Sequence, residues 1–154
     1  MQLDSQSGKD LEFDSVLYLL SSYCKSQKAK DNALKLNYFG SPQLVSQEFD
    51  LLSEIKTIYE EGKTSFPLLN AEDIDHALTL LRIENGVLIL PEVIKVYTLC
   101  LGTKQLIDFT NANKIECPNL FAACQHIDKV DAVLTMIRTV LDDKKLDIKD
   151  TATP

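Results

Sequence analysis

Apolar residues recur every three or four positions along most of this 154-residue chain, and strict alternation of apolar and polar residues is scarce. This spacing is typical of amphipathic helices. Only 5 Gly and 5 Pro are present, which leaves few turns for a sandwich or barrel of many short strands. The sequence therefore predicts an all-α fold, an irregular bundle of about seven helices. Residues 146–148 alternate and fit either one very short strand near the C-terminus or an extended tail.

Capping residues and Pro mark the expected helix starts, and Gly marks the expected ends. Asp14 is the expected cap of the first helix, and Ser41 caps the third. Gly40, Gly62 and Gly86 close the second, third and fourth helices. The expected helices begin near residue 13, after Ser26, at Pro42, near Ala71, at Pro91, at Pro118 and after Asp128.

The expected inward face of each helix consists of the apolar positions at helical spacing. These are Val16, Leu17, Leu20 and Cys24 in the first helix, Ala29, Ala33 and Leu36 in the second, Val45, Phe49, Leu52, Ile55 and Tyr59 in the third, and Ile74, Ala77, Leu78 and Leu81 in the fourth.

We expect one helical domain over residues 11–150, with a disordered tail at 1–10 and the start of a further segment at 151–154. The N-terminus has neither the charged nor the apolar region of a secretory signal. The longest apolar run, Val87–Leu90, is far shorter than the ~20 residues of a membrane span. These features predict a cytoplasmic protein with no membrane partner. Pro usually opens a helix, so Pro154 at the end indicates a chain cut from something longer.

The four cysteines, Cys24, Cys100, Cys117 and Cys124, each have apolar neighbours and are predicted to be free, structural residues. Cys117, Cys124 and His126 are close in sequence, which raises the alternative of a zinc site. Structural zinc needs four ligands, commonly with closely spaced Cys pairs. No fourth ligand stands nearby, so we favour a buried Cys beside a surface His.

The string Gly62-Lys63-Thr64 resembles the tail of a nucleotide-binding P-loop. Such a loop needs another Gly five positions before Gly62, where this chain has Thr57. It also follows a strand, whereas an amphipathic helix precedes Gly62. We interpret the string as a helix-ending Gly followed by a solvated Lys. Neither His76 nor His126 belongs to a recognisable nucleophile motif.

The charge pattern argues against a free-standing DNA-binding module. The formal net charge is −7, and phosphate binding depends on Lys and Arg. The chain has only two arginines, Arg82 and Arg138. The basic cluster is interpreted as a solvated helix face; it consists of Lys25, Lys28, Lys30 and Lys35.

Acidic pairs occur at Glu60–Glu61, Glu72–Asp73 and Asp142–Asp143, and each falls at an expected helix end. Negative charge in a first helical turn is stabilising, so we interpret these pairs as capping charge rather than a metal site or an acid–base pair. The residues themselves thus assign no catalytic, cofactor-binding or metal-ligating side chain.

A series of short motifs resembles, in order and spacing, the start of MutS2-type proteins of the MutS superfamily. The motifs are packing motifs, and they span the chain from about residue 11. They are Leu11-Glu12-Phe13-Asp14-x-Val16-Leu17, Leu20-x-x-Tyr23-Cys24-x-Ser26, Pro67-Leu68, Asp73-Ile74-x-x-Ala77-Leu78, Glu84-Asn85-Gly86-Val87-Leu88, Pro91-Glu92, Ile137-x-x-Val140-Leu141-Asp142-Asp143 and Ile148-x-Asp150-Thr151-Ala152-Thr153-Pro154.

The resemblance implies the N-terminal helical core of a DNA mismatch repair or recombination-control ATPase. In that family ATP and Mg²⁺ bind towards the C-terminus, DNA is gripped by clamp segments elsewhere, and the full-length protein is a homodimer. The core would transmit the nucleotide state to those clamps without catalysing a reaction or binding nucleic acid itself. Two departures from the family pattern are a missing Gly near Lys144–Lys145 and the scarcity of arginine.

Two other functions stay open on the sequence alone. The first is an unrelated α-helical adaptor that binds a partner protein or peptide in a groove. The second is a small helical enzyme whose site the sequence does not reveal.

Overall fold

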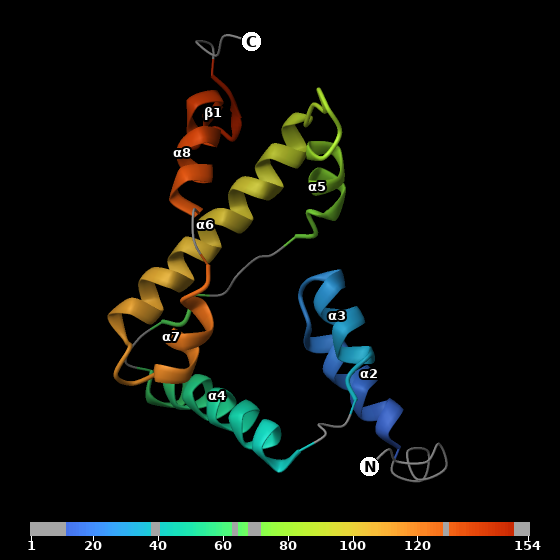
Figure 1. Cartoon of the computed structure of the whole chain (residues 1–154), viewed down its shortest axis with the longest axis vertical. Coiled ribbons are helices and arrows are strands. Elements are labelled where there is room, and N and C mark those ends of the chain that lie inside the picture. Colours follow the sequence, from blue (N-terminus) through green and yellow to red (C-terminus); the bar gives the residue numbers. More distant parts are fainter. Residues whose placement is uncertain (1–11, 38–40, 63–64, 68–71, 128–129, 150–154) are drawn as a thin grey trace. The chain divides into compact units, whose positions relative to one another are not determined.

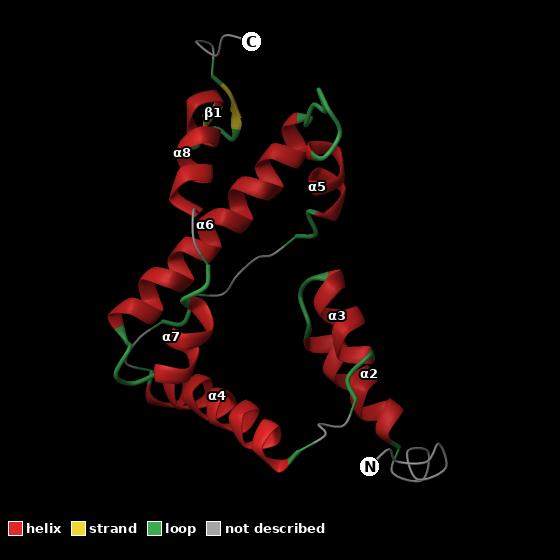
Figure 2. Cartoon of the chain, in the orientation of Figure 1, coloured by secondary structure: helices red, strands yellow, loops and turns green. Residues whose placement is uncertain are grey.

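A computed structural model describes residues 12–37, 41–62, 65–67, 72–127 and 130–149. Within these residues the chain forms seven α-helices and one two-stranded antiparallel sheet, which confirms the all-α prediction and the short strand near the C-terminus (Figure 2). The elements are α2 (Phe13–Tyr23), α3 (Gln27–Leu34), α4 (Pro42–Glu61), α5 (Asp75–Leu81), α6 (Leu90–Ala112), α7 (Pro118–Cys124), α8 (Val130–Val140), β1 (Leu141–Asp142) and β2 (Asp147–Ile148).

The chain divides into two compact units, residues 1–52 and 53–154, with the boundary inside α4. The expectation of a single domain over 11–150 stays a prediction. The expected tail at 1–10 and the segment at 151–154 lie outside the described residues, as do Gly40, Ala71 and Asp128. None of the helices that the structure describes is both long enough and apolar enough to cross a membrane.

In the first unit, α2 and α3 pack against each other as a helical hairpin. Leu17 and Ser21 of α2 and Ala33 of α3 are buried. The Oγ of Ser26 accepts a hydrogen bond from the Ala29 N–H at 3.1 Å, so Ser26 caps α3, and the helix begins after Ser26 as expected. The predicted cap of α2 is wrong. Glu12 occupies that position in a left-handed conformation with φ 51°, and its side chain makes no capping hydrogen bond.

The expected inward face of α2 is also partly wrong, because Val16 and Leu20 are exposed. A helix with apolar residues on more than one face does not itself determine which face is covered, and contact with α3 selects the side that carries Leu17 and Ser21. In α3, Leu36 lies beyond the helix end and is exposed as well.

The long helix α4 begins and ends as the sequence predicts. Ser41 Oγ accepts a hydrogen bond from the Leu44 N–H at 3.3 Å, and Gly62 after the last turn has φ 59°. Its buried face differs from the expectation. Ile58 is buried, with Leu51 and Ile55 half-buried, whereas three of the expected inward residues are exposed, namely Phe49, Leu52 and Tyr59.

In the second unit, α5, α7 and α8 pack against α6 at different points along its length (Figure 1). Pro91 lies in the first turn of α6, as expected. The core consists of Tyr97, Leu134 and Leu141. Partly buried apolar residues of α6 and α8 surround it: Leu90, Ile94, Cys100, Leu101, Val130 and Ile137.

Helix α5 starts later than the sequence predicts. Asp73 precedes the helix and its carboxylate accepts the Asp75 N–H at 2.9 Å, so it caps the helix from outside. Ala77 is fully buried, as expected, but Leu78 and Leu81 are exposed. The buried position of α5 is thus taken by a residue as small as Ala, and the helix packs against α6.

The sheet is a short hairpin that follows α8 directly. Leu141 pairs with Ile148 and Asp142 with Asp147. The Asp142 carboxylate accepts the backbone N–H of Lys144 at 3.0 Å and that of Lys145 at 3.3 Å. Both hydrogen bonds lower the pKa of Asp142 below its ordinary value, and the one from the Lys144 N–H has the larger effect. Asp142 therefore stabilises the hairpin turn, and its acidic pair does not end a helix as expected.

Candidate functional site

The contact between α4 and α7 is built on one carboxylate. Glu54 Oε1 accepts hydrogen bonds from the Asn119 backbone N–H at 2.9 Å and from the Asn119 side-chain amide at 2.8 Å. Glu54 Oε2 accepts the Leu120 N–H at 2.9 Å. The first amides of a helix have no partner within the helix, so an acidic side chain placed there satisfies them. Glu54 thus holds the start of α7 against α4.

The cysteines beside this contact are free, as the sequence predicts. Cys117 precedes α7, is buried, and its Sγ donates a hydrogen bond to the Asn113 carbonyl at 3.0 Å. Burial raises the pKa of Cys117, and the charge of Glu54 raises it further. Burial also raises the pKa of Cys124 at the other end of α7. A raised pKa leaves little thiolate at neutral pH, so these thiols are poor nucleophiles.

The structure does not bring the alternative zinc residues together as a ligand set. His126 is exposed in the turn after α7, whereas Cys117 and Cys124 are buried. Among the residues that the structure describes, no group of three or more His, Cys, Asp or Glu side chains is placed to hold a metal ion.

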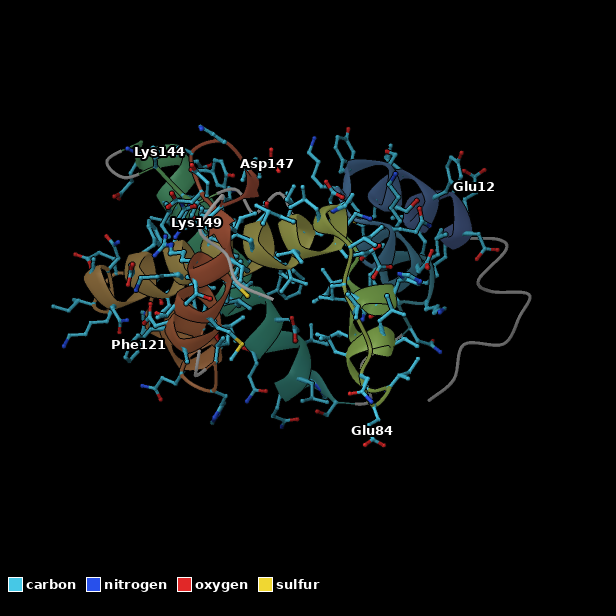
Figure 3. The ribbon with its side chains drawn as sticks, turned by 90° about the horizontal axis from the view of Figure 1, so that it is seen from above. Glu12, Glu84, Phe121, Lys144, Asp147 and Lys149 are labelled. Atoms are coloured by element: carbon cyan, nitrogen blue, oxygen red, sulfur yellow. The ribbon has the colours of Figure 1, made fainter. Side chains whose placement is uncertain are left out.

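A small cavity of about 200 Å³ lies between the C-terminal part of α6 and α7. Its lining combines apolar and amide side chains, including Ile107, Asn111, Phe121 and Gln125, and Figure 3 labels Phe121. The volume is below the roughly 300–1,000 Å³ of typical small-molecule sites. Thr110, at the same cavity, is buried and donates its hydroxyl hydrogen bond to the Ile107 carbonyl at 3.0 Å. The Thr110 hydroxyl is therefore hydrogen-bonded to the backbone of its own helix.

Charged contacts join α6 to α8. Lys104 Nζ lies 3.0 Å from the carboxylate of Asp131 on α8 and 3.6 Å from that of Asp108 on α6. The hydrogen bond to Asp131 is the main cause that raises the pKa of Lys104. Lys104 therefore ties the C-terminal half of α6 to the start of α8.

A second contact lies at the other end of α8. The Arg138 guanidinium stands 5.8 Å from the centre of the Tyr97 ring, and its Nη2 donates a hydrogen bond to the Tyr97 hydroxyl at 3.4 Å. Arg138 Nε also lies 3.7 Å from the Asp143 carboxylate. Lys149, labelled in Figure 3, donates from Nζ to the Arg138 carbonyl. Arg138 therefore links α6, α8 and the hairpin, and the contact with Tyr97 raises the pKa of Arg138.

The corner between α5 and α6 carries a further polar contact. His76 Nδ1 lies 3.3 Å from Glu92 Oε1. The other carboxylate oxygen of Glu92 is buried and has no hydrogen-bond partner among the residues that the structure describes. His76 is exposed, so the pair forms a bridge at the surface and not an enclosed acid–base site.

The remaining features that the sequence singles out lie apart from these contacts. Gly62 ends α4, as predicted, while Lys63 and Thr64 are outside the described residues. The lysines of the basic cluster lie on or beside α3 and are exposed or half-exposed, in keeping with a solvated face. Glu60–Glu61 are exposed at the end of α4.

The sequence interpretation missed Glu54, whose carboxylate accepts three hydrogen bonds from the start of α7. Its signal is positional: Glu54 stands three residues after Leu51 and four before Ile58, on the buried face of α4. A charged residue in an apolar stripe needs a polar partner when the stripe is buried. The sequence interpretation placed the buried face of α4 on the side of Phe49, Leu52 and Tyr59, so Glu54 was not recognised as a buried-face residue.

The contacts between helices described above, made by Glu54, Lys104, Arg138 and His76, do not converge on a common cavity. No family model, no curated protein and no solved structure matches the chain.

Proposed function

We propose that this chain is the N-terminal helical core of a MutS-like DNA mismatch repair or recombination-control ATPase. In this role it catalyses no reaction and transmits the nucleotide state to DNA-clamping segments elsewhere in the full-length protein. The observation that carries the proposal is the ordered series of family-like motifs, because those in the described residues fall on helix ends, turns and helix contacts.

The middle motifs illustrate this correspondence. Asp73 caps α5 and Ala77 is its fully buried residue. Asn85 has φ 61°, and a Cβ added to Gly86 would lie 2.0 Å from the Leu80 carbonyl oxygen, so the Asn-Gly step fits this turn. Pro91 then occupies the first turn of α6.

The last motif in the described residues spans the end of α8 and the hairpin. Ile137 packs against the core, and Leu141 is 1% exposed within it. Asp142 holds the turn through its hydrogen bonds to the backbone. Residues at such positions constrain the path of the chain, which explains why a packing motif would be retained there.

The contacts between α6 and α8 support a mechanical role. Lys104 joins the two helices at one end, and Arg138 joins α6, α8 and the hairpin at the other. Two separated attachments resist both sliding and rotation of α8 along α6. Packed helices of this kind move as rigid elements, so a displacement applied at one end is delivered at the other.

One observation favours the adaptor as a second candidate. Large apolar side chains are exposed on both units, among them Tyr23, Phe49, Val87, Ile115 and Met136. Exposed apolar surface of this extent is typical of a protein that contacts partners. In the proposed function the same surface meets other segments of the full-length protein, whereas an adaptor would present it to a separate protein.

The native gene gives the first test. The proposal predicts that the reading frame continues past the codon for Pro154 into long amphipathic helices and later into a P-loop. A frame that stops at Pro154 would overturn the proposal and leave the adaptor.

Biochemistry of the purified chain gives the second test. We expect no ATP hydrolysis in a phosphate-release assay, and no mobility shift of duplex or four-way-junction DNA at physiological salt. ATP turnover that resists further purification would contradict both non-enzymatic functions. Saturable binding of one apolar peptide to the isolated chain, measured by titration calorimetry, would favour the adaptor.

A third test addresses transmission in the full-length protein. The variant Lys104→Met with Arg138→Met removes both attachments of α8 and should reduce DNA-stimulated ATP turnover while nucleotide affinity stays unchanged. The matched control is Lys56→Met, which removes an exposed ion pair with Glu60 on the surface of α4. Unchanged DNA stimulation in the double variant would refute the transmission role.

A further inference from the structure

The turn between α5 and α6 contains the step Asn85-Gly86. The Gly86 N–H donates a hydrogen bond to the Ile83 carbonyl at 2.9 Å, which closes a four-residue turn. Asn85 is the third residue of this turn and has φ 61°, a left-handed conformation that Asn tolerates better than most residues. Asn85 is exposed, as is Glu84, whose side chain points away from the ribbon in Figure 3. The turn therefore presents an amide side chain at the surface, directly before a glycine.

An Asn that precedes Gly undergoes a specific reaction, because glycine has no Cβ to hinder attack by its own nitrogen. The Gly86 nitrogen forms a bond to the side-chain carbonyl carbon of Asn85. The bond from that carbon to the side-chain amide nitrogen breaks, and ammonia leaves with the proton of the Gly86 N–H. Water then opens the succinimide ring at one of its two carbonyl carbons. The product is either aspartate or isoaspartate, and in isoaspartate the main chain passes through the side-chain carbons and is one atom longer.

The structure restrains the first step of this reaction. The Gly86 nitrogen attacks only after its N–H has left the Ile83 carbonyl, to which it is hydrogen-bonded in the closed turn. Gly86 is also held closely against backbone, since a Cβ at this position would lie 2.0 Å from the Leu80 carbonyl oxygen. The closed turn therefore protects Asn85, and the reaction proceeds from a locally opened form of the turn.

The two products differ in how well they fit the closed turn. Aspartate has the same main chain as Asn and also tolerates the left-handed conformation. Isoaspartate adds one main-chain atom directly before Gly86, where the Leu80 carbonyl already fills one side of the glycine. Helix α5 is only seven residues long, so it depends on its packing against α6 and on this turn for its position. A turn that no longer closes would therefore free the end of α5.

We propose that Asn85 is a site of deamidation and that isoaspartate at this position releases α5 from α6. The closed turn protects the site, so the modification accumulates in chains whose turn opens. Release of α5 would uncover Ala77, which is fully buried in the unmodified chain. This inference goes beyond the proposed function and does not depend on it, since it concerns the isolated chain.

Mass spectrometry of the aged chain tests the modification. The folded chain is incubated at neutral pH and physiological temperature and then digested with trypsin, and a sample digested without incubation gives the background. The tryptic peptide of residues 83–95 contains Asn85 and no other Asn. It should acquire the mass of the aspartate form and become a substrate for protein isoaspartate methyltransferase.

Two other asparagines are matched controls in the same digest. Asn32 of α3 and Asn111 of α6 are both exposed, but each precedes Ala instead of Gly. They should remain unmodified over the time in which Asn85 reacts. An unmodified Asn85, or earlier conversion of Asn32 or Asn111, would overturn the proposal.

The protecting role of the turn is tested by repeating the incubation in guanidinium chloride. Conversion of Asn85 should be roughly tenfold slower in the folded chain than in the unfolded chain, as expected if one hydrogen bond must open first. Hydrogen exchange of the Gly86 amide measures the same opening independently. Equal conversion rates in the folded and unfolded chains would refute protection by the turn.

The release of α5 is tested on the isoaspartate form, which ion-exchange chromatography separates from the unmodified chain. The matched control is freshly prepared Asn85→Asp, which carries the same added charge on a main chain of normal length. Hydrogen exchange of the α5 amides should be faster in the isoaspartate form than in the wild type, whereas Asn85→Asp should exchange like the wild type. Unchanged exchange in the isoaspartate form would overturn the release of α5. Equally fast exchange in both forms would assign the effect to the added charge and would overturn it as well.

Discussion

Leu146 in the hairpin turn gives the sharpest test of the structure. It has φ 53°, in the left-handed region, and its N–H donates to the Asp142 carbonyl at 2.8 Å. A side chain with a Cβ adopts this conformation at a cost of about 1–2 kcal/mol, whereas Gly adopts it freely. The Gly that the MutS resemblance places near Lys144–Lys145 is absent, and the structure puts the left-handed residue immediately after those lysines.

The magnitude follows from comparing Gly with Ala at position 146. Relief of strain favours Gly by about 1–2 kcal/mol, and the larger backbone entropy of Gly in the unfolded chain opposes it by about 0.5–1 kcal/mol. Leu146→Gly should therefore be more stable than Leu146→Ala by about 0.5–1 kcal/mol. Both variants lose the Leu side chain, so its contacts cancel in the comparison. At Ala132, exposed inside α8, the order should be the usual one, with Ala132→Gly less stable than the wild type by about 0.5–1 kcal/mol.

Urea unfolding followed by the helical circular dichroism signal measures these differences, provided that all variants share the same denaturant slope. The expected result is that Gly is more stable than Ala at position 146 and that Ala is more stable than Gly at position 132. If Leu146→Ala proves as stable as Leu146→Gly, residue 146 does not adopt the left-handed conformation in the hairpin turn.

Three further predictions concern single contacts. Gly86→Ala should cost about 3 kcal/mol in thermal unfolding, because the added Cβ would lie 2.0 Å from the Leu80 carbonyl oxygen; Gly62→Ala, with φ 59° and open space around it, should cost only about 1–2 kcal/mol. Glu54→Ala should destabilise the chain by about 2–4 kcal/mol and speed hydrogen exchange at the first amides of α7, and Glu54→Gln should have an intermediate effect. Equal exchange in the wild type and both variants would contradict the capping role of Glu54. Backbone hydrogen bonds in the hairpin turn lower the pKa of Asp142 from 3.8, so Asp142 stabilises the fold above its unfolded-state pKa, and this stabilisation is lost as the pH falls through the folded-state pKa. Asp142→Asn should therefore reduce the loss of stability at acid pH in a series of urea midpoints measured at different pH values. An unchanged dependence of the midpoint on pH would refute this prediction.

Helix positions follow from the sequence because their signals are local. Ser26 and Ser41 offer a side-chain oxygen to a nearby N–H, and Pro91 fits a first turn without a lost hydrogen bond. Gly62 adopts the left-handed conformation that ends a helix. These interactions involve residues three or four apart. Three positions are exceptions. Asp73 caps α5 from two residues before the helix, and Glu12 instead of Asp14 precedes α2 at the cap position. Helix α5 also ends at Leu81 and not at Gly86, which the sequence predicts as its end.

The contacts that join helices could not be found in this way. Glu54 and Asn119 are 65 residues apart, and Tyr97 and Arg138 are 41 apart. Each of these side chains is ordinary in its own segment, and only the packing of α7 on α4, or of α8 on α6, gives it a role. Tyr97 could be assigned to the buried side of α6 from its spacing, but nothing in the sequence pairs its ring with Arg138.

The errors in buried faces have a common cause. Helix α4 has apolar residues on two sides, Leu51 and Ile58 on one and Phe49 and Leu52 on the other, so helical periodicity fits both. Transfer from water favours burying either side by a similar amount. The choice then depends on polar contacts, and Glu54 stabilises the side it shares with Leu51 and Ile58 by capping α7. The side that loses this competition stays apolar and exposed. A helix of a self-contained small domain has one apolar side, so a second one on α4 argues for further contacts, as both the proposed function and the adaptor require.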